Sequence, residues 1–230
     1  MSPLVLCYHG VVEGEPQRLA VRRDVLERQL RSLLHRGWTP VGAGEAVEGT
    51  GRRFHVTFDD AYRSVVEVLP LLASLGVRST VFPATVFARD GRAFDVPELR
   101  DDARSRPDTF ATMDWDALRA VAASGVEIGS HTVTHPHLPQ LPDDELDREL
   151  RDSKAELEAE LGARCRWLAY PYGDHDERVR RSARLAGYEA AFAVGGRAGD
   201  PFASPRLAVY RHDTWAGFRL RTSTLARVLL

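Results

Sequence analysis

The sequence has little cysteine. Its two cysteines, Cys7 and Cys165, lie far apart and form neither a CxxC pair nor a cysteine–histidine spacing. This argues against a disulfide framework and against a thiolate zinc site. We therefore expect two buried free thiols.

A long hydrophobic run is missing as well. The first residues, MSPLVLCYHGVV, lack a positively charged leader, and His9 interrupts their apolar stretch. The segment therefore predicts neither a signal peptide nor a membrane span. From this sequence we expect a cytoplasmic protein. If a leader has been removed, a secreted or envelope-bound location is the alternative.

Charge of one sign is not in excess. The 31 basic and 33 acidic residues give a formal charge of −2 and are spread along the chain, so no basic stripe predicts a nucleic-acid partner. With 230 residues and 43% apolar content, the chain can bury a sizeable core. No composition break marks a boundary, so we expect one domain over residues 1–230, in an oligomeric state that the sequence leaves open.

Short β-branched or aromatic segments alternate with segments of helical periodicity. The predicted strands cover residues 4–9, 54–58, 79–85, 126–132, 166–172, 188–194 and 206–211. The predicted helices cover residues 24–36, 62–75, 114–124, 143–161, 175–187 and 215–229. This alternation favours right-handed βαβ units and a parallel sheet. Residues 88–113 have no clear period and predict a long insertion loop with one short helix.

Polar side chains stand where predicted strands end, which is where active sites of such sheets collect. Asp59 and Asp60 follow one strand, and His131 and His135 follow another. Alone, the aspartates could cap a helix and the histidines could be ordinary loop residues. Together, one carboxylate and two imidazoles give three ligands and an open position, the arrangement of a catalytic zinc site.

Three motifs carry a resemblance to a known family. "TFDD" (57–60), "SHTVTH" (130–135) and "AYPYG" (169–173), in this order among alternating strands and helices, resemble the polysaccharide deacetylase family, also called NodB-homology or carbohydrate esterase family four. "LCYHGV" (6–11) is similar to the subgroup that begins with a "YH" strand. The resemblance implies an α/β fold, a distorted (β/α) barrel of about seven parallel strands.

The resemblance also implies a metal-dependent hydrolase that removes the N-acetyl group of an amino sugar. Asp60, His131 and His135 would bind a divalent metal, usually Zn²⁺, and Asp59 would be the general base for a metal-bound water. The chemistry agrees with these residue types, because a cation lowers the pKa of water and a carboxylate can take its proton.

The resemblance implies a substrate-binding role for the third motif. Pro171 and Tyr172 would line the groove, and the backbone N–H of Tyr172 would help to hold the oxyanion. Tyr62, Trp115 and Trp215 are further candidates for stacking on a sugar, although aromatic residues are more often part of the core.

The general acid is less well defined by sequence. No "LxH" motif is present between Arg206 and Leu230. The resemblance to the "YH" subgroup therefore gives the role of general acid to His9, and His212 is the alternative. The other interpretation of His9 is a strand-end histidine that caps a turn. We expect His35, His55, His137 and His175 to be surface or supporting histidines, with His137 closest to the site.

Two positions depart from the family pattern. Ala61 stands where glycine usually follows the aspartates, so the turn is expected to avoid the left-handed conformation. Ala169 stands where an arginine often orients the base. We group Arg206 with the substrate-binding residues, and it could take the place of that arginine. The alternative is that Arg206 is an ordinary surface residue.

The expected activity is therefore deacetylation of an N-acetylglucosamine-type polysaccharide, oligosaccharide or precursor. An amidase or cyclic-imide hydrolase on the same scaffold would use the same metal ligands on a non-sugar substrate. A non-catalytic sugar-binding module should have lost Asp59 or a histidine ligand, and this chain keeps them all.

Overall fold

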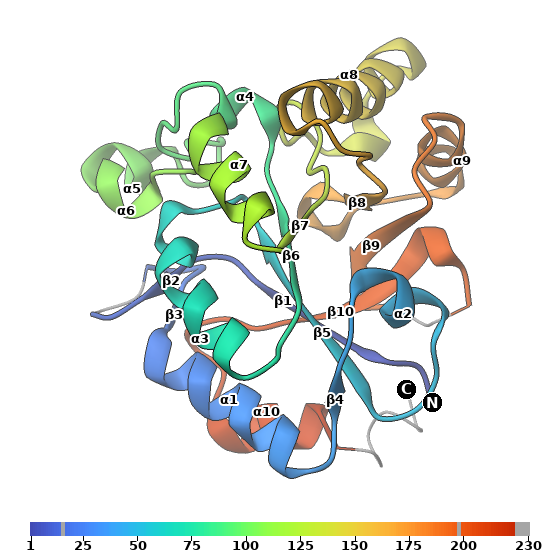
Figure 1. Cartoon of the computed structure of the whole chain (residues 1–230). Helices are drawn as coiled ribbons and strands as arrows, with labels where there is room; N and C mark the ends of the chain where they lie inside the picture. Colours follow the sequence, from blue (N-terminus) through green and yellow to red (C-terminus); the bar gives the residue numbers. More distant parts are fainter. Residues whose placement is uncertain (15–16, 197–198, 224–230) are drawn as a thin grey trace.

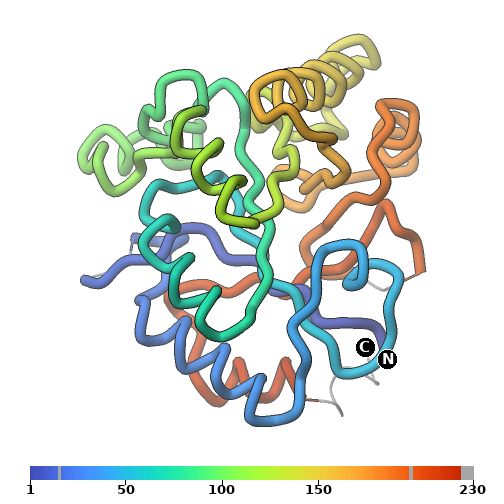
Figure 2. The backbone as a smooth tube through the Cα atoms, viewed as in Figure 1, coloured from blue at the N-terminus to red at the C-terminus, as the bar shows by residue number. Residues whose placement is uncertain are grey.

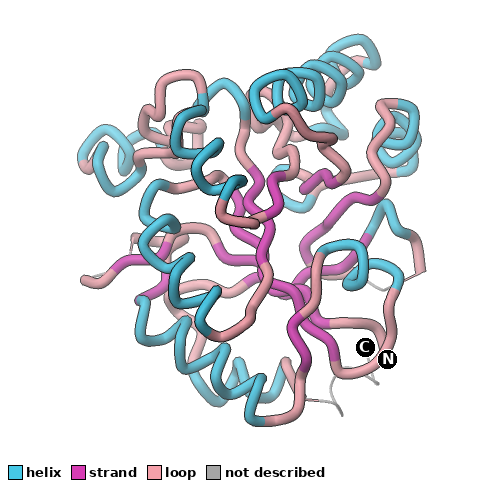
Figure 3. The backbone as a smooth tube through the Cα atoms, in the orientation of Figure 1, coloured by secondary structure: helices cyan, strands magenta, loops and turns pink. Residues whose placement is uncertain are grey.

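The computed structural model describes residues 1–14, 17–196 and 199–223. A parallel sheet curls into a nearly closed barrel in the centre of the molecule, and helices surround it (Figure 3). The strand order is β7-β6-β5-β1-β10-β9-β8, with β4 added beside β5. This confirms the α/β class and the distorted (β/α) barrel of seven parallel strands.

The strands of the barrel agree with the predicted segments and are mostly shorter. They are β1 (Leu4–Tyr8), β5 (Arg53–Asp59), β6 (Ser79–Phe82), β7 (Glu127–Ile128), β8 (Trp167–Ala169), β9 (Ala190–Val194) and β10 (Ser204–Ala208). The strand β4 (Thr39–Pro40) and the small pair β2 (Val11–Val12) and β3 (Val21–Arg22) were not predicted. Each of these three has only two residues, which is too short for a period to be seen.

A single residue closes the barrel between β7 and β8. The Ser130 N–H donates to the Trp167 carbonyl at 2.8 Å, and the Ala169 N–H donates to the Ser130 carbonyl at 2.9 Å. The preceding Gly129 makes this approach possible, because a Cβ there would lie 2.3 Å from the Phe82 ring. The closure fixes the strand end from which His131 follows.

Helices cover the outside of the barrel (Figure 1). They are α1 (Arg23–His35), α2 (Ala43–Glu48), α3 (Leu69–Ser74), α4 (Thr85–Ala88), α5 (Arg100–Ser105), α6 (Pro107–Phe110), α7 (Trp115–Ala123), α8 (Asp143–Leu161), α9 (Glu177–Leu185) and α10 (Trp215–Arg221). Side-chain caps begin α7 and α9: Asp114 accepts from Ala117 N–H, and Asp176 accepts from Val179 N–H. The part of the last predicted helix from residue 224 onward lies outside the described residues.

The prediction of one helix over residues 62–75 was wrong. The chain forms a 3₁₀ helix, η1 (Arg63–Val68), followed by the short α3. Pro70 explains the break, because proline has no N–H and its ring clashes with the carbonyl four residues earlier in an α-helix.

The insertion at residues 88–113 is more ordered than predicted. It contains two short helices, α5 and α6, where one was expected, and its apolar side chains Phe94, Leu99, Ala103 and Phe110 are buried in the core. These residues have no single period because they come from turns and short helices. The tube in Figure 2 shows this segment in green on one side of the barrel.

The core of the described residues has three clusters. The largest includes Leu4, Phe54 and Leu72, a second includes Leu146, Leu150 and Val179 of α8 and α9, and a third includes Val5, Phe82 and Phe192. His55 is completely buried, with Nδ1 2.8 Å from the Val41 carbonyl and Nε2 2.9 Å from Thr80 Oγ1. Among the described residues, no helix has the length and apolar character needed to cross a membrane. The single-domain organisation of residues 1–230 stays a prediction.

Candidate active site

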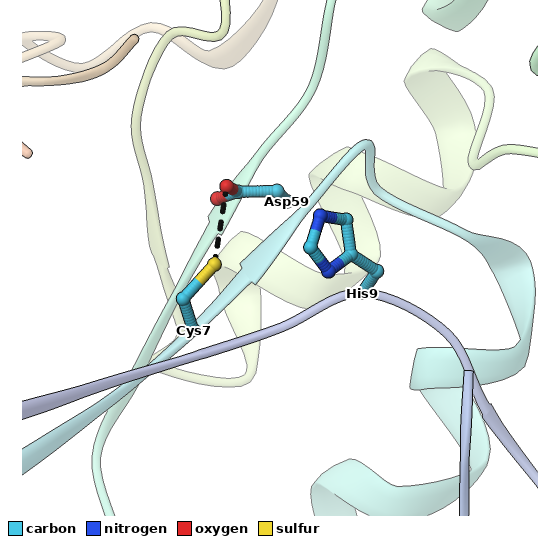
Figure 4. A group of neighbouring side chains, drawn as sticks. All are labelled: Cys7, His9 and Asp59. Carbon is cyan, nitrogen blue, oxygen red and sulfur yellow. Dashed lines mark hydrogen bonds between the residues drawn. The ribbon is translucent and has the colours of Figure 1, made fainter. Parts of the chain in front are cut away.

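The strand pattern brings reactive side chains to one place. Cys7 pairs with Thr57 in the parallel register of β1 and β5, and Asp59 follows two residues after Thr57. His9 follows Cys7 at the same interval. Since alternate residues of a strand share a face, Cys7, His9 and Asp59 lie together, as Figure 4 shows.

Asp60, His131 and His135 form the group best suited to hold a metal ion. Asp60 Oδ1 lies 3.6 Å from His131 Nε2 and 3.6 Å from His135 Nε2, and all three residues are buried. His131 Nδ1 lies 2.7 Å from the Ala169 carbonyl. This contact places the proton on Nδ1 and directs the free electron pair of Nε2 toward Asp60.

The charges of this group fit a divalent cation. Asp60 Oδ1 and His135 Nδ1 are buried and have no hydrogen-bond partner among the residues that the structure describes. Burial lowers the pKa of both histidines, so they are neutral and able to bind a metal. Burial and the charge of Asp59 raise the pKa of Asp60 well above its usual value. A buried carboxylate oxygen without a donor beside two neutral imidazoles is a suitable set of ligands for such an ion.

Helix α8 holds the loop that carries these histidines. Glu149 Oε2 accepts hydrogen bonds from the N–H groups of Val133 at 2.8 Å and Thr134 at 2.9 Å. The Thr132 hydroxyl accepts from His135 N–H at 3.1 Å. The loop is thus fixed by a carboxylate on the adjacent helix, a support that the motif itself does not reveal.

Arg206 holds the other aspartate. Its Nη1 donates to Asp59 Oδ1 at 2.6 Å and its Nη2 donates to Asp59 Oδ2 at 2.8 Å. Burial alone would raise the pKa of Asp59, but the charge of Arg206 outweighs it and holds that pKa well below the usual range. The alternative of a surface arginine was wrong, since Arg206 is only 2% exposed.

His9 stands beside Asp59. The Nδ1 atom of His9 is buried and has no hydrogen-bond partner, and its ring stacks on Tyr210. Burial lowers the pKa of His9 to about 4. Ligand atoms of Cys7, His9 and Asp59 also lie within 4.8 Å of one another (Figure 4). This second group is less suited to a metal, because Arg206 already occupies both oxygens of Asp59.

Backbone strain is concentrated at the site. In the part of the chain that the structure describes, the non-glycine residues with positive φ are Asp60, Ala61, Thr132, His135 and Tyr172, with φ between 50° and 69°. All five belong to the turns that carry the predicted site residues. Left-handed conformations cost about 1–3 kcal/mol each, so the surrounding contacts have to hold them in place.

The expectation for Ala61 was wrong. Its φ of 50° lies in the left-handed region that it was expected to avoid. The Met113 N–H donates to the Ala61 carbonyl at 2.8 Å, and the Arg63 N–H donates to the Ala111 carbonyl at 2.8 Å. These bonds to the end of the insertion hold the turn in the conformation that glycine would adopt more easily.

A cavity of about 230 Å³ opens over Asp59, Asp60, His131 and His135. Its wall also includes His9 and Tyr210, then Phe94, Val96, Glu98 and Leu99 from the insertion, and Arg18, Leu19, Tyr172, Gly173 and Val194. The cavity therefore connects both aspartates with His9.

Tyr172 stands at the mouth of this cavity, 36% exposed. Its hydroxyl donates to Glu98 at 2.8 Å, and its ring stacks on His137 with centroids 3.9 Å apart. His137 is thus near the site, as expected. Pro171 is buried under the same turn, η3 (Pro171–Gly173), and is not among the residues that line the cavity.

Several aromatic candidates lie elsewhere. Tyr62 is completely buried in the core, Trp115 packs against the core clusters, and Trp215 packs under Arg28 with the guanidinium carbon 4.3 Å from its ring. His212 is exposed and stacks on Tyr210, outside the residues that line the cavity. Of the two proposed general acids, only His9 lines the cavity.

Comparison with known proteins identifies the family. The family model for polysaccharide deacetylases matches residues 46–191. The chain belongs to the polysaccharide deacetylase family. A putative polysaccharide deacetylase of Bacillus subtilis, YxkH, is 22% identical over 193 residues, which are 80% of this chain. The chain spans 62% of the length of that relative.

Two solved structures share the fold. IcaB from Ammonifex degensii is 24% identical and superimposes with a TM-score of 0.79, covering 96% of this chain and 97% of that one. The Streptococcus pyogenes deacetylase PplD, in complex with acetate, is 19% identical and has a TM-score of 0.78, covering 97% and 99% of the two chains. At these identities the likeness shows that the polysaccharide deacetylase barrel is shared.

Proposed function

We propose that this chain is a metal-dependent carbohydrate deacetylase that hydrolyses the N-acetyl group of an amino sugar. The observation that carries the proposal is the pair of adjacent aspartates with different partners. Asp59 is held by Arg206, whereas Asp60 faces His131 and His135 with an oxygen that has no donor. Family membership supports the same reaction.

Asp60, His131 and His135 would hold the cation, for which Zn²⁺ suits the two imidazoles and one carboxylate. When bound, such an ion supplies a Lewis acid that polarises the acetyl carbonyl and lowers the pKa of water. Asp59 would take the proton of the attacking water. Its Oδ2 lies 3.9 Å from His131 Nε2, and Arg206 keeps the carboxylate ionised until the proton arrives.

His9 would deliver a proton to the departing amine. Because burial lowers its pKa to about 4, the free protein carries a neutral His9 at pH 7. The proton would therefore be supplied during the reaction, and Asp59, whose ligand atom lies within 4.8 Å of that of His9, is the nearest source. The exposed His212 has no such neighbour in the cavity wall.

The mouth of the cavity suits a sugar ring. Tyr172 offers a partly exposed aromatic face that Glu98 and His137 hold in place, and aromatic faces stack on apolar faces of sugars. The backbone N–H of Tyr172 remains the proposed partner of the oxyanion. Arg206 would act through Asp59 and not through the substrate.

The direct experiment compares two classes of substrate. We expect the purified protein to release acetate from N-acetylglucosamine oligomers and to leave a cyclic imide closed. Ring opening of the imide without acetate release would favour the second candidate, an amidase on the same barrel. A protein that binds the oligomers and hydrolyses neither substrate would be a sugar-binding module.

A further inference from the structure

Cys7 is a buried thiol inside the "LCYHGV" motif, in which the resemblance gives a role only to His9. It lies in the middle of the barrel wall, completely buried, on the strand that also carries His9. Its Sγ donates to Asp59 Oδ2 at 3.3 Å (Figure 4). The other cysteine, Cys165, is also buried, but its Sγ is directed to the Trp167 carbonyl at 3.7 Å.

The thiol contacts the oxygen of Asp59 that faces the proposed metal ligands. Oδ2 is the oxygen that lies 3.9 Å from His131 Nε2, next to the metal ligands. Arg206 binds both oxygens from β10, and Cys7 binds Oδ2 from β1. The guanidinium fork fixes both oxygens from one direction, and a donor from a second strand holds Oδ2 from another.

The thiol is suited to this role because it remains a donor. Burial raises the pKa of Cys7 well above its ordinary value, so the sulfur keeps its proton throughout the neutral range. A hydrogen bond accepted by a charged carboxylate is stronger than one between neutral groups. Cys7 is completely buried, so a larger side chain at position 7 would have to displace the side chains packed around it.

We propose that Cys7 is a positioning residue for the deacetylation reaction: its thiol holds Asp59 Oδ2 in the orientation in which this oxygen accepts the proton of water. The inference rests on the proposed function. It requires a small hydrogen-bond donor at position 7, and it gives Cys7 no contact with the substrate.

The test compares Cys7→Ala and Cys7→Ser with a matched control, Cys165→Ala, in acetate release from N-acetylglucosamine oligomers. We expect Cys7→Ala to lower kcat about tenfold with KM within about twofold, the size of effect that loss of one bond to a charged group produces. The serine hydroxyl should restore kcat to within about threefold of wild type, because it is a small donor. Cys165→Ala should lose stability and keep its kcat.

A second measurement does not depend on activity. The infrared S–H stretch of Cys7, assigned by its disappearance in Cys7→Ser, should lie at the lower frequency of a hydrogen-bonded thiol and rise in Asp59→Asn, while the Cys165 band stays in place. Circular dichroism checks the folding of every variant. If Cys7→Ala does not fold, the kcat of Cys7→Ser and the infrared shift test the role of Cys7.

The outcomes separate the two proposals. A wild-type protein without acetate release would overturn the proposed function and this inference with it. An active wild type, together with a folded Cys7→Ala of equal kcat or an S–H band unchanged by Asp59→Asn, would overturn the role of Cys7 alone.

Discussion

Arg206 holds Asp59 with two hydrogen bonds, of 2.6 Å and 2.8 Å, although 147 positions separate the two residues in the sequence. The pair joins β10 to β5 across β1, which lies between them in the sheet. It is almost fully removed from solvent. The arginine thus supplies the charge that a buried ionised base needs, from a strand outside the three main motifs.

Replacing Arg206 should damage both stability and activity. Arg206→Met leaves a buried carboxylate without its partner, which costs about 3–5 kcal/mol of unfolding free energy. Arg206→Lys keeps the charge but loses the fork, so we expect it to fold and to lose about 10–100-fold in kcat/KM. Urea unfolding and acetate release measure the two effects. A fully active Arg206→Met would contradict this account of Asp59.

Removal of the metal should destabilise the folded protein, and this effect should depend on Asp60. A cation present at 100 times its Kd stabilises the folded protein by about 2.7 kcal/mol. For a chain of this size, a chelator should then lower Tm by about 5–10 °C. Asp60→Asn should lose most of this response, because it removes the only negatively charged ligand of the three.

The matched control for that experiment is Asp174→Asn. Asp174 lies 2.6 Å from His137 Nδ1 near the mouth of the cavity and is not one of the three proposed ligands. A chelator should lower the Tm of Asp174→Asn by as much as it lowers the Tm of wild type. The same response in Asp60→Asn and in wild type would show that the cation binds elsewhere.

Ala61→Gly should be nearly neutral for stability. Glycine stabilises the folded protein by relieving a left-handed conformation that costs about 1–2 kcal/mol. Two effects oppose this gain: the unfolded chain gains conformational freedom worth about 0.5–1 kcal/mol, and a buried methyl group worth about 0.8 kcal/mol is lost. We expect a change within about 1 kcal/mol. Ala183→Gly, inside α9 and equally buried, gains no such relief and should cost about 1.3–1.8 kcal/mol. Equal losses in the two variants would argue against the strained turn.

The buried His55 should make the protein sensitive to acid. Burial lowers its pKa to about 4 in the folded state, while the unfolded chain has a pKa near 6.5. Between these two values the unfolded state binds more protons, so stability falls as the pH falls through this window, by up to about 1.4 kcal/mol per pH unit. His55→Gln should show a smaller loss between pH 7 and pH 5 in urea unfolding. An identical loss in both proteins would assign the sensitivity to other groups.

Much of this candidate site could be predicted from the sequence, because its central residues form local motifs. Asp59 with Asp60, and His131 with His135, are close in the chain, and the ends of parallel strands bring the two pairs together. The alternation of strands and helices likewise predicted the parallel sheet, and the family resemblance implied the barrel. The alanine at position 169 raised Arg206 as a replacement for the missing arginine, but the sequence left a surface arginine as the alternative, because only the fold shows that Arg206 is buried.

Other features depend on contacts between distant residues. The bond from Cys7 to Asp59 follows from the register of β1 and β5, which no local pattern contains. Glu98 reaches Tyr172 from an insertion without periodicity. The conformation of Ala61 follows from its bond to Met113, so local preference alone predicted it incorrectly.

The most direct test of the central claim is acetate release by Asp59→Asn, measured with the metal content of the same preparation. If Asp59 takes the proton of water while Asp60, His131 and His135 hold the cation, the variant should keep the metal content of wild type and lose at least about 100-fold in kcat. A folded Asp59→Asn with wild-type kcat would contradict the account, as would a wild-type protein that releases acetate at full rate after its metal is removed.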